Sequence, residues 1–170
     1  MGRNEIDKLA ELAGIVPDPD PYQSAPRAPR GDSVPMPDGR ESWSVGPVDI
    51  RGWQDWGTLT SWDVSGYRSG SIVIAADTNG GAGQPQGLHA EVRVLGFIGS
   101  TGYLITEDAV GHDTSLPAEM SAGPLRVVLR EGDVPHRIEI QARARLAGLP
   151  HSEVLASQLL AASASARFGK

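Results

Sequence analysis

From Trp43 to the C-terminus, the chain alternates between short apolar runs and turn-forming residues. The runs predicted as strands are Val48–Gly52, Thr58–Val64, Ser71–Ala76, Ala90–Ile98, Tyr103–Thr106, Leu125–Arg130 and Arg137–Leu146. Short strands at this spacing, with no long helices between them, are typical of an antiparallel β-sandwich or jelly roll. The pattern therefore predicts a mainly-β domain and argues against a parallel α/β fold.

Two of the predicted strands alternate clearly between apolar and polar positions. In the last of them, one face carries Ile138, Ile140, Ala142 and Ala144, and the other carries Glu139, Gln141, Arg143 and Arg145. In the segment 90–98, Val92 and Val94 face one way with Arg93 between them, and a one-residue slip brings Phe97 to the valines' face. A period of two predicts that one face packs on a core while the other meets water or a partner.

A short helix is predicted near the N-terminus, from Asn4 to Ala13. Its apolar face consists of Ile6, Leu9, Ala10 and Ala13, which recur at helical spacing. Asn4 can cap its start, and Gly14 followed by Pro17 ends it. Because so short a helix is not stable alone, this face is expected to bind its own domain or another protein.

Prolines recur between the helix and the apolar runs, from Pro17 to Gly39. They keep the backbone extended and remove hydrogen-bond donors, so this stretch is predicted to be a semi-rigid arm. The expected organisation is a helix at 1–16, a proline-rich arm at 17–42 and a β-sandwich domain at 43–170. Tyr22, in the arm, joins Ile6, Leu9, Ala10 and Ala13 as the predicted partner-binding residues.

The last segment, from Ser152 to Arg167, fits two structures. Ser152 can cap a helix on which Leu155, Leu159 and Ala162 share a face. In a jelly roll, however, the same segment would be a strand that pairs with Arg137–Leu146 across a short loop. Both alternatives remain open on the sequence alone.

Composition excludes several kinds of site. The chain has 170 residues and no cysteine, which rules out disulfides and cysteine-based metal centres. Its formal net charge of -6 gives no overall attraction for nucleic acid or anionic membranes. No apolar stretch is long enough to span a bilayer, and the first residues lack the pattern of a signal peptide. The expected partners are therefore proteins, with no nucleic acid, membrane or cofactor.

Four tryptophans, at positions 43, 53, 56 and 62, form the most conspicuous cluster of a single residue type. Exposed aromatic rings on a β-sandwich can stack on sugars, and Trp53 and Trp56 are the candidates for such a glycan site. The alternative is that the rings close the edge of the core. Exposure of the pair would distinguish the two.

Other motifs are weak. The loop that begins at Asp77 has oxygen ligands among glycines but lacks the acidic spacing of a calcium-binding loop, so a hairpin loop is expected. The four histidines are scattered without metal-binding spacing, and no metal site is predicted. The sequence has no phosphate-binding loop or nucleophile elbow, so no catalytic residues are predicted. A hydrolase would need two convergent carboxylates or a metal in a cleft.

The segment RIEIQARARL (137–146), a short loop and then VLASQLLA (154–161) resemble the late strands of jelly-roll virion proteins of tailed bacteriophages. The N-terminal helix and arm are similar to the arms that join neighbouring subunits in such particles. The resemblance spans about three quarters of the chain and is one of style, without a family signature. It implies a non-enzymatic capsid decoration or head or tail accessory protein, assembled in the host cytoplasm as a homo-oligomer or lattice member.

Overall fold

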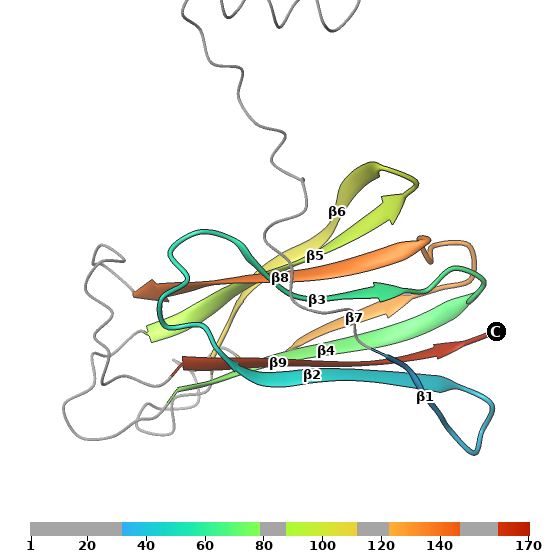
Figure 1. Ribbon diagram of the computed structural model, residues 1–170, viewed down its shortest axis with the longest axis horizontal. Coiled ribbons are helices and arrows are strands. Elements are labelled where there is room, and N and C mark those ends of the chain that lie inside the picture. The colour runs from blue at the N-terminus through green and yellow to red at the C-terminus, as the bar shows by residue number, and fades with distance from the viewer. Residues whose placement is uncertain (1–31, 79–87, 112–122, 147–159) are drawn as a thin grey trace, which may run out of the picture.

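The structure is a computed structural model, and it describes residues 32–78, 88–111, 123–146 and 160–170. Two antiparallel sheets pack face to face in this part of the chain (Figure 1). A mainly-β fold is thereby confirmed. The predicted helix and most of the predicted arm, residues 1–31, lie outside the described residues.

The lower sheet in Figure 1 has five strands in the order β1-β2-β9-β4-β7, and the upper sheet has four in the order β3-β8-β5-β6. The five are β1 (Val34–Pro35), β2 (Glu41–Asp49), β9 (Leu160–Gly169), β4 (Ser69–Thr78) and β7 (Leu125–Leu129). The four are β3 (Gly57–Asp63), β8 (Arg137–Leu146), β5 (Leu88–Ile98) and β6 (Thr101–Val110).

Strands that follow one another along the chain mostly belong to opposite sheets. From β2 to β9, only β5 and β6 form a hairpin within one sheet, and every other step crosses between the sheets. Strands distant in sequence therefore become neighbours, such as β2 with β9 and β3 with β8. Leaving aside the short β1, this is the eight-stranded order of a jelly roll.

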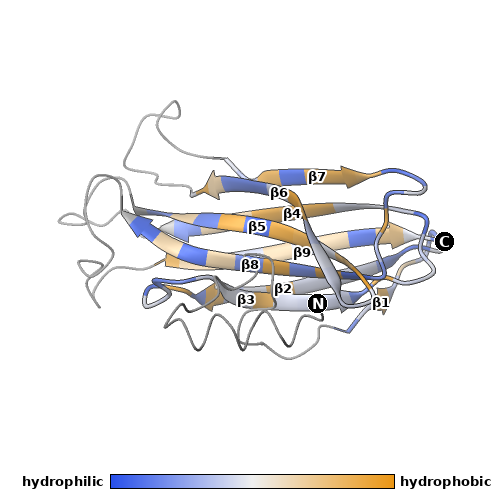
Figure 2. Ribbon diagram, turned by 90° about the horizontal axis from the view of Figure 1, so that it is seen from above, coloured by the Kyte–Doolittle hydropathy of each residue, from blue (hydrophilic) through white to orange (hydrophobic). Residues whose placement is uncertain are grey.

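The core lies between the sheets and is built from the inward-facing positions of both. On β8 these are Ile138, Ile140, Ala142 and Ala144, as predicted, and all are buried. On β9 the buried positions are Leu160, Ala162, Ala164, Ala166 and Phe168. Figure 2 shows the alternation of hydrophobic and hydrophilic residues along β5 and β8. The core combines these short alanines with larger, fully buried side chains such as Trp62.

Three aromatic rings close one end of this core. The ring centroid of Trp43 lies 5.2 Å from that of Tyr67 and 5.3 Å from that of Phe168, both in edge-to-face geometry. Burial raises the pKa of Tyr67 to about 12, and a hydrogen bond to Glu41 adds to this effect. These contacts hold the start of β2 to the turn before β4. Trp43 thus belongs to the core.

The bounds of β2 differ most from the prediction. The strand predicted at Val48–Gly52 begins instead at Glu41 and ends at Asp49. Its alternation is broken where the register with β9 shifts between Val45 and Val48. A positive φ of 92° at Gly46 accompanies this bulge. Because of the bulge, Val48 faces the core three residues after Val45, so the period of two set by Trp43 and Val45 does not continue through the strand.

The strand alternative for the last segment is confirmed for its described part, since β9 runs from Leu160 to Gly169. The expected pairing with Arg137–Leu146 was wrong, because β9 lies in the other sheet between β2 and β4. The prediction for Phe97 was also wrong. β5 pairs with β8 without a register shift, so Phe97 lies on the face of Arg93 and not on that of Val92 and Val94.

The part of the chain that the structure describes contains no helix long and apolar enough to cross a membrane.

Candidate functional site

The outer face of the four-stranded sheet carries a dense group of charged and polar side chains, which we call the ionic face. Its members on β5 and β8 are Glu91, Arg93, Arg137, Glu139, Gln141, Arg143 and Arg145, joined by Thr58 and Ser61 of β3 and by Trp56. Residues two apart on a strand point the same way, and β5 pairs with β8 without a register shift. On β3 the register with β8 shifts between Thr58 and Thr60, so Thr58 and Ser61 share this face although they are three residues apart.

Glu139 lies at the centre of the ionic face and is fully buried. One carboxylate oxygen accepts hydrogen bonds from the Thr58 hydroxyl (2.8 Å) and the Gln141 amide (2.7 Å). The other accepts from the Arg137 guanidinium at 3.1 Å, which forms an ion pair. Arg137 also stacks over Phe97, 4.0 Å from the ring centroid. A buried carboxylate needs such donors, and here three neighbouring side chains supply them.

Trp56 lies beside this group, and two guanidinium groups lie over its indole. Arg93 and Arg143 are 4.4 Å and 4.3 Å from the ring centroid. Arg93 also donates to the Gln141 side-chain oxygen at 2.7 Å. Trp56 belongs to the segment between β2 and β3, and these cation–π contacts attach that segment to the outer face of the sheet. Trp56 is therefore part of an ordered ionic network.

Glu91 ends the network, where it binds two arginines. Arg143 NH2 and Arg145 Nε lie 2.6 Å and 3.1 Å from the same Glu91 carboxylate oxygen. Burial raises the pKa of Glu91, but the hydrogen bonds and charges of these arginines outweigh it and the net pKa is lowered. The carboxylate is therefore held ionised, a state that suits an ion pair and not a general acid.

The outer face of the five-stranded sheet is different in character, and we call it the serine face. Short side chains dominate its central strands, namely Ala161, Ser163 and Ser165 on β9 and Ser69, Ser71, Val73 and Ala75 on β4. Arg167 of β9 lies on this face between Ser42 and Ser71, while Asp49 and Asp77 flank Ala161. The face therefore has a basic end and an acidic end.

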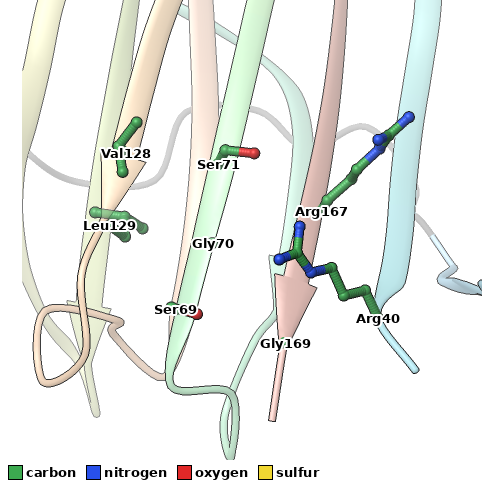
Figure 3. A pocket seen from close by; sticks show the side chains of 8 residues that line it. All are labelled: Arg40, Ser69, Gly70, Ser71, Val128, Leu129, Arg167 and Gly169. Atoms are coloured by element: carbon green, nitrogen blue, oxygen red, sulfur yellow. The ribbon is translucent and has the colours of Figure 1, made fainter. Parts of the chain in front are cut away.

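A hollow of about 190 Å³ lies at the basic end (Figure 3). Its lining comprises Arg40, Ser69, Gly70, Ser71, Val128, Leu129, Arg167 and Gly169. Figure 3 shows the side chains of Arg40 and Arg167 near the end of β9. Two guanidinium groups and two serine hydroxyls at one opening offer hydrogen-bond donors to an acidic group.

The residues predicted as sites are placed as follows. Ile6, Leu9, Ala10, Ala13 and Tyr22 lie outside the described residues, and partner binding by them stays a prediction. Trp53 is half-buried, packs against the core, and its backbone oxygen accepts a hydrogen bond from the amide of Ala144 at 2.8 Å. Trp56 is also half-buried. Glycan binding by this pair stays a prediction.

Sequence reasoning missed the ionic face as a unit. The alternation placed Glu139 and Gln141 opposite the core, yet both are completely buried. Leu95 and Phe97 share this face and are buried as well, outside the main core cluster. Oppositely charged residues on β5 and β8, such as Glu91 and Arg143, were the available signal, but their pairing follows only from the strand order.

In the described ranges, no group of three or more histidine or acidic side chains is arranged to hold a metal ion.

No protein-family model matches this chain, and no curated protein is significantly similar to it in sequence. Among solved structures it is similar to that of infectious bursal disease virus, Gx strain, with a TM-score of 0.39 and 16% identity over 76% of this chain. It is similar also to that of infectious bursal disease virus, Gt strain, with a TM-score of 0.38 and 13% identity over 81% of this chain. The matched region is 32% and 37% of those chains, so this chain spans about a third of their length.

Proposed function

We propose that this protein is a non-enzymatic structural component of a virus particle, specifically a tailed-bacteriophage capsid decoration or head or tail accessory protein. The observation that carries the proposal is the jelly-roll strand order, β2-β9-β4-β7 against β3-β8-β5-β6. Jelly rolls are common among capsid and lectin domains, so the support is a fold-level analogy. It therefore requires a direct test on particles.

The arrangement of charges supports a binding module over an enzyme. Glu139 is ion-paired with Arg137 and Glu91 with Arg143, and these ion pairs hold the side chains of the ionic face in place. Rigid sheet faces with fixed polar groups are suited to contacts with other proteins. In this proposal the sandwich is presented at the particle surface.

The N-terminal helix and arm are the proposed attachment. The first described residues lead into β1, the edge strand of the five-stranded sheet, so the described chain begins at the rim of the sandwich. The apolar positions Ile6, Leu9, Ala10 and Ala13, with Tyr22, would bind a neighbouring subunit. A short helix gains stability from such docking.

Mass spectrometry and immunogold electron microscopy of gradient-purified particles from the source culture test this proposal. The chain is expected at regular positions on the particle, and its absence from particles would overturn the function. Leu9→Asp in the full chain is expected to abolish incorporation, whereas Lys8→Ala retains it. Normal incorporation of Leu9→Asp would overturn the attachment alone.

A further inference from the structure

The serine face has opposite charges at its two ends. At the acidic end, Asp49 and Asp77 flank Ala161 across the strands; Asp49 is ion-paired with Arg51 at 2.6 Å, so Asp77 carries the exposed negative charge of this end. At the basic end, Arg167 lies six positions further along β9, beside the hollow that Arg40 also lines. At about 3.3 Å per residue, the two ends are about 20 Å apart. On β4 and β9 the residues between them are short, and the long side chain of Arg126 lies to one side, on β7.

We propose that the serine face binds the serine face of a second copy of this chain, in an isologous dimer. The two-fold axis would run parallel to the sheet, midway between the two copies, perpendicular to β9 and level with Ala164. This rotation reverses the strand direction, so the basic end of each copy covers the acidic end of the other. Because the two copies of an isologous dimer are equivalent, each of these charged contacts occurs twice.

The register of the sheet specifies the contacts. Ala164 pairs with Ile74 of β4, and Ser71 and Asp77 lie three residues to either side of Ile74. Asp77 of the second copy therefore lies over Ser71, at the hollow lined by Arg40 and Arg167. On β9 the same rotation places Arg167 over Ala161 of the second copy, between its two aspartates. The carboxylate of Asp77 thus meets guanidinium and hydroxyl donors.

Side-chain size favours close approach along the middle of the face. Ser163 and Ser165 lie over Ser165 and Ser163 of the second copy, and Val73 lies over its Ala75. None of these side chains is long enough to hold the sheets apart at the usual spacing of about 10 Å. An alternative rotation about the strand axis would place Arg167 over Arg167, and repulsion disfavours it.

The size of the face sets the expected strength. Seven residues on each of β2, β9 and β4, with the shorter β7 and β1 beside them, give a footprint of about 400 Å² per copy at about 4.8 Å between strands and about 3.3 Å per residue. The total of about 800 Å² is typical of a weak or transient interface. We therefore expect a reversible dimer, with a dissociation constant on the order of micromolar that rises with salt because surface charges are screened.

Sedimentation velocity of the full chain over a range of concentrations tests the dimer. Arg167→Glu and Asp77→Arg are each expected to raise the dissociation constant at least tenfold. The double variant exchanges the two charges and is expected to restore dimerisation, because each new Glu faces a new Arg. Glu107→Arg, an exposed charge reversal on β6 of the other sheet, is the matched control and leaves dimerisation unchanged.

Cysteine cross-linking tests the direction of the strands. The chain has no native cysteine, so any disulfide comes from an introduced residue. A mixture of Ser163→Cys and Ser165→Cys chains is expected to cross-link faster than either variant alone. Faster cross-linking of either variant with itself would overturn the arrangement. A chain that stays monomeric at high concentration, or single charge variants that dimerise like the parent, would overturn the interface.

Discussion

Glycines inside the strands make room for aromatic rings on neighbouring segments. A Cβ at Gly57 would come within 2.6 Å of the Trp53 ring, and one at Gly96 within 2.6 Å of the Tyr103 ring. At Gly70 it would collide with the ring of Phe168. These glycines are needed for close approach and not for a left-handed backbone, as is common for glycine within strands.

Gly70→Ala is predicted to destabilise the fold by about 1–3 kcal/mol, the usual cost of overpacking a core. Phe168 is fully buried and packs on Trp43, so its ring has little room to move. The collision is expected to outweigh the gain from a less flexible unfolded chain. Urea unfolding followed by tryptophan fluorescence measures the change. Gly52→Ala is the control, since a Cβ there meets nothing within 4 Å, and equal stability of the two variants would contradict the prediction.

At the scale of elements, the ionic face joins β3, β5 and β8 through side chains. Glu139 of β8 accepts from Thr58 of β3 and pairs with Arg137, while Gln141 connects it to Arg93 of β5. The central strand is therefore tied to both neighbours by bonds beyond the backbone ladder. Such networks stabilise only when every member keeps its partner.

Removing the centre of this network is predicted to be costly. Glu139→Ala leaves the Arg137 guanidinium without its buried counter-ion, and the free energy of unfolding is expected to fall by about 3–5 kcal/mol. Glu131→Ala is the matched control, because the Glu131–Arg68 pair has side chains 76% and 74% exposed. An exposed pair contributes less than about 1 kcal/mol. Denaturant unfolding compares the two, and a similar loss in both would refute the role of Glu139.

The sequence predicts elements unevenly, for physical reasons. β8 was predicted with its observed bounds because its apolar period of two is unbroken from Ile138 to Ala144. β2 was predicted too short because a bulge at Gly46 shifts its period. Phe97 was assigned to the wrong face because its apolar character suggested the core, whereas it stacks under Arg137. The local pattern therefore predicts that a strand forms, but not which side chains cover the face that points away from the core.

At the scale of the whole molecule, strand order was the least predictable feature. For the last segment, Ser152–Arg167, the sequence left helix and strand both open, and the strand alternative placed it in a hairpin with Arg137–Leu146. The chain instead crosses to the other sheet, where the small residues of β9 fit between β2 and β4. Both candidate faces depend on this topology, because β9 places Asp49 and Asp77 on either side of Ala161 and the order β3-β8-β5 places Glu91 beside Arg143.

The whole protein is predicted to lose stability in acid. The pKa of Glu41 is lowered, mainly by a hydrogen bond from Ser33. The pKa of Asp49 is lowered as well, mainly by a hydrogen bond from the Arg51 side chain. The pKa of Glu91 is lowered by Arg143 and Arg145 in spite of burial. As the pH falls towards and below 4.5, the ordinary pKa of glutamate, the folded chain therefore binds fewer protons than the unfolded chain. The stabilisation is present above that pH and is lost as pH falls through the lowered values.

Urea unfolding at a series of pH values measures this loss. The free energy of unfolding is expected to be nearly constant from pH 7 to about 5.5 and to fall steeply below about 4.5. Glu91→Gln should be less stable at pH 7 and less sensitive to acid, since it has no carboxylate to protonate. Glu107→Gln, on the exposed part of β6, should follow the parent curve. If Glu91→Gln ran parallel to the parent down to pH 3.5, the Glu91 ion pairs would not be a source of the acid response.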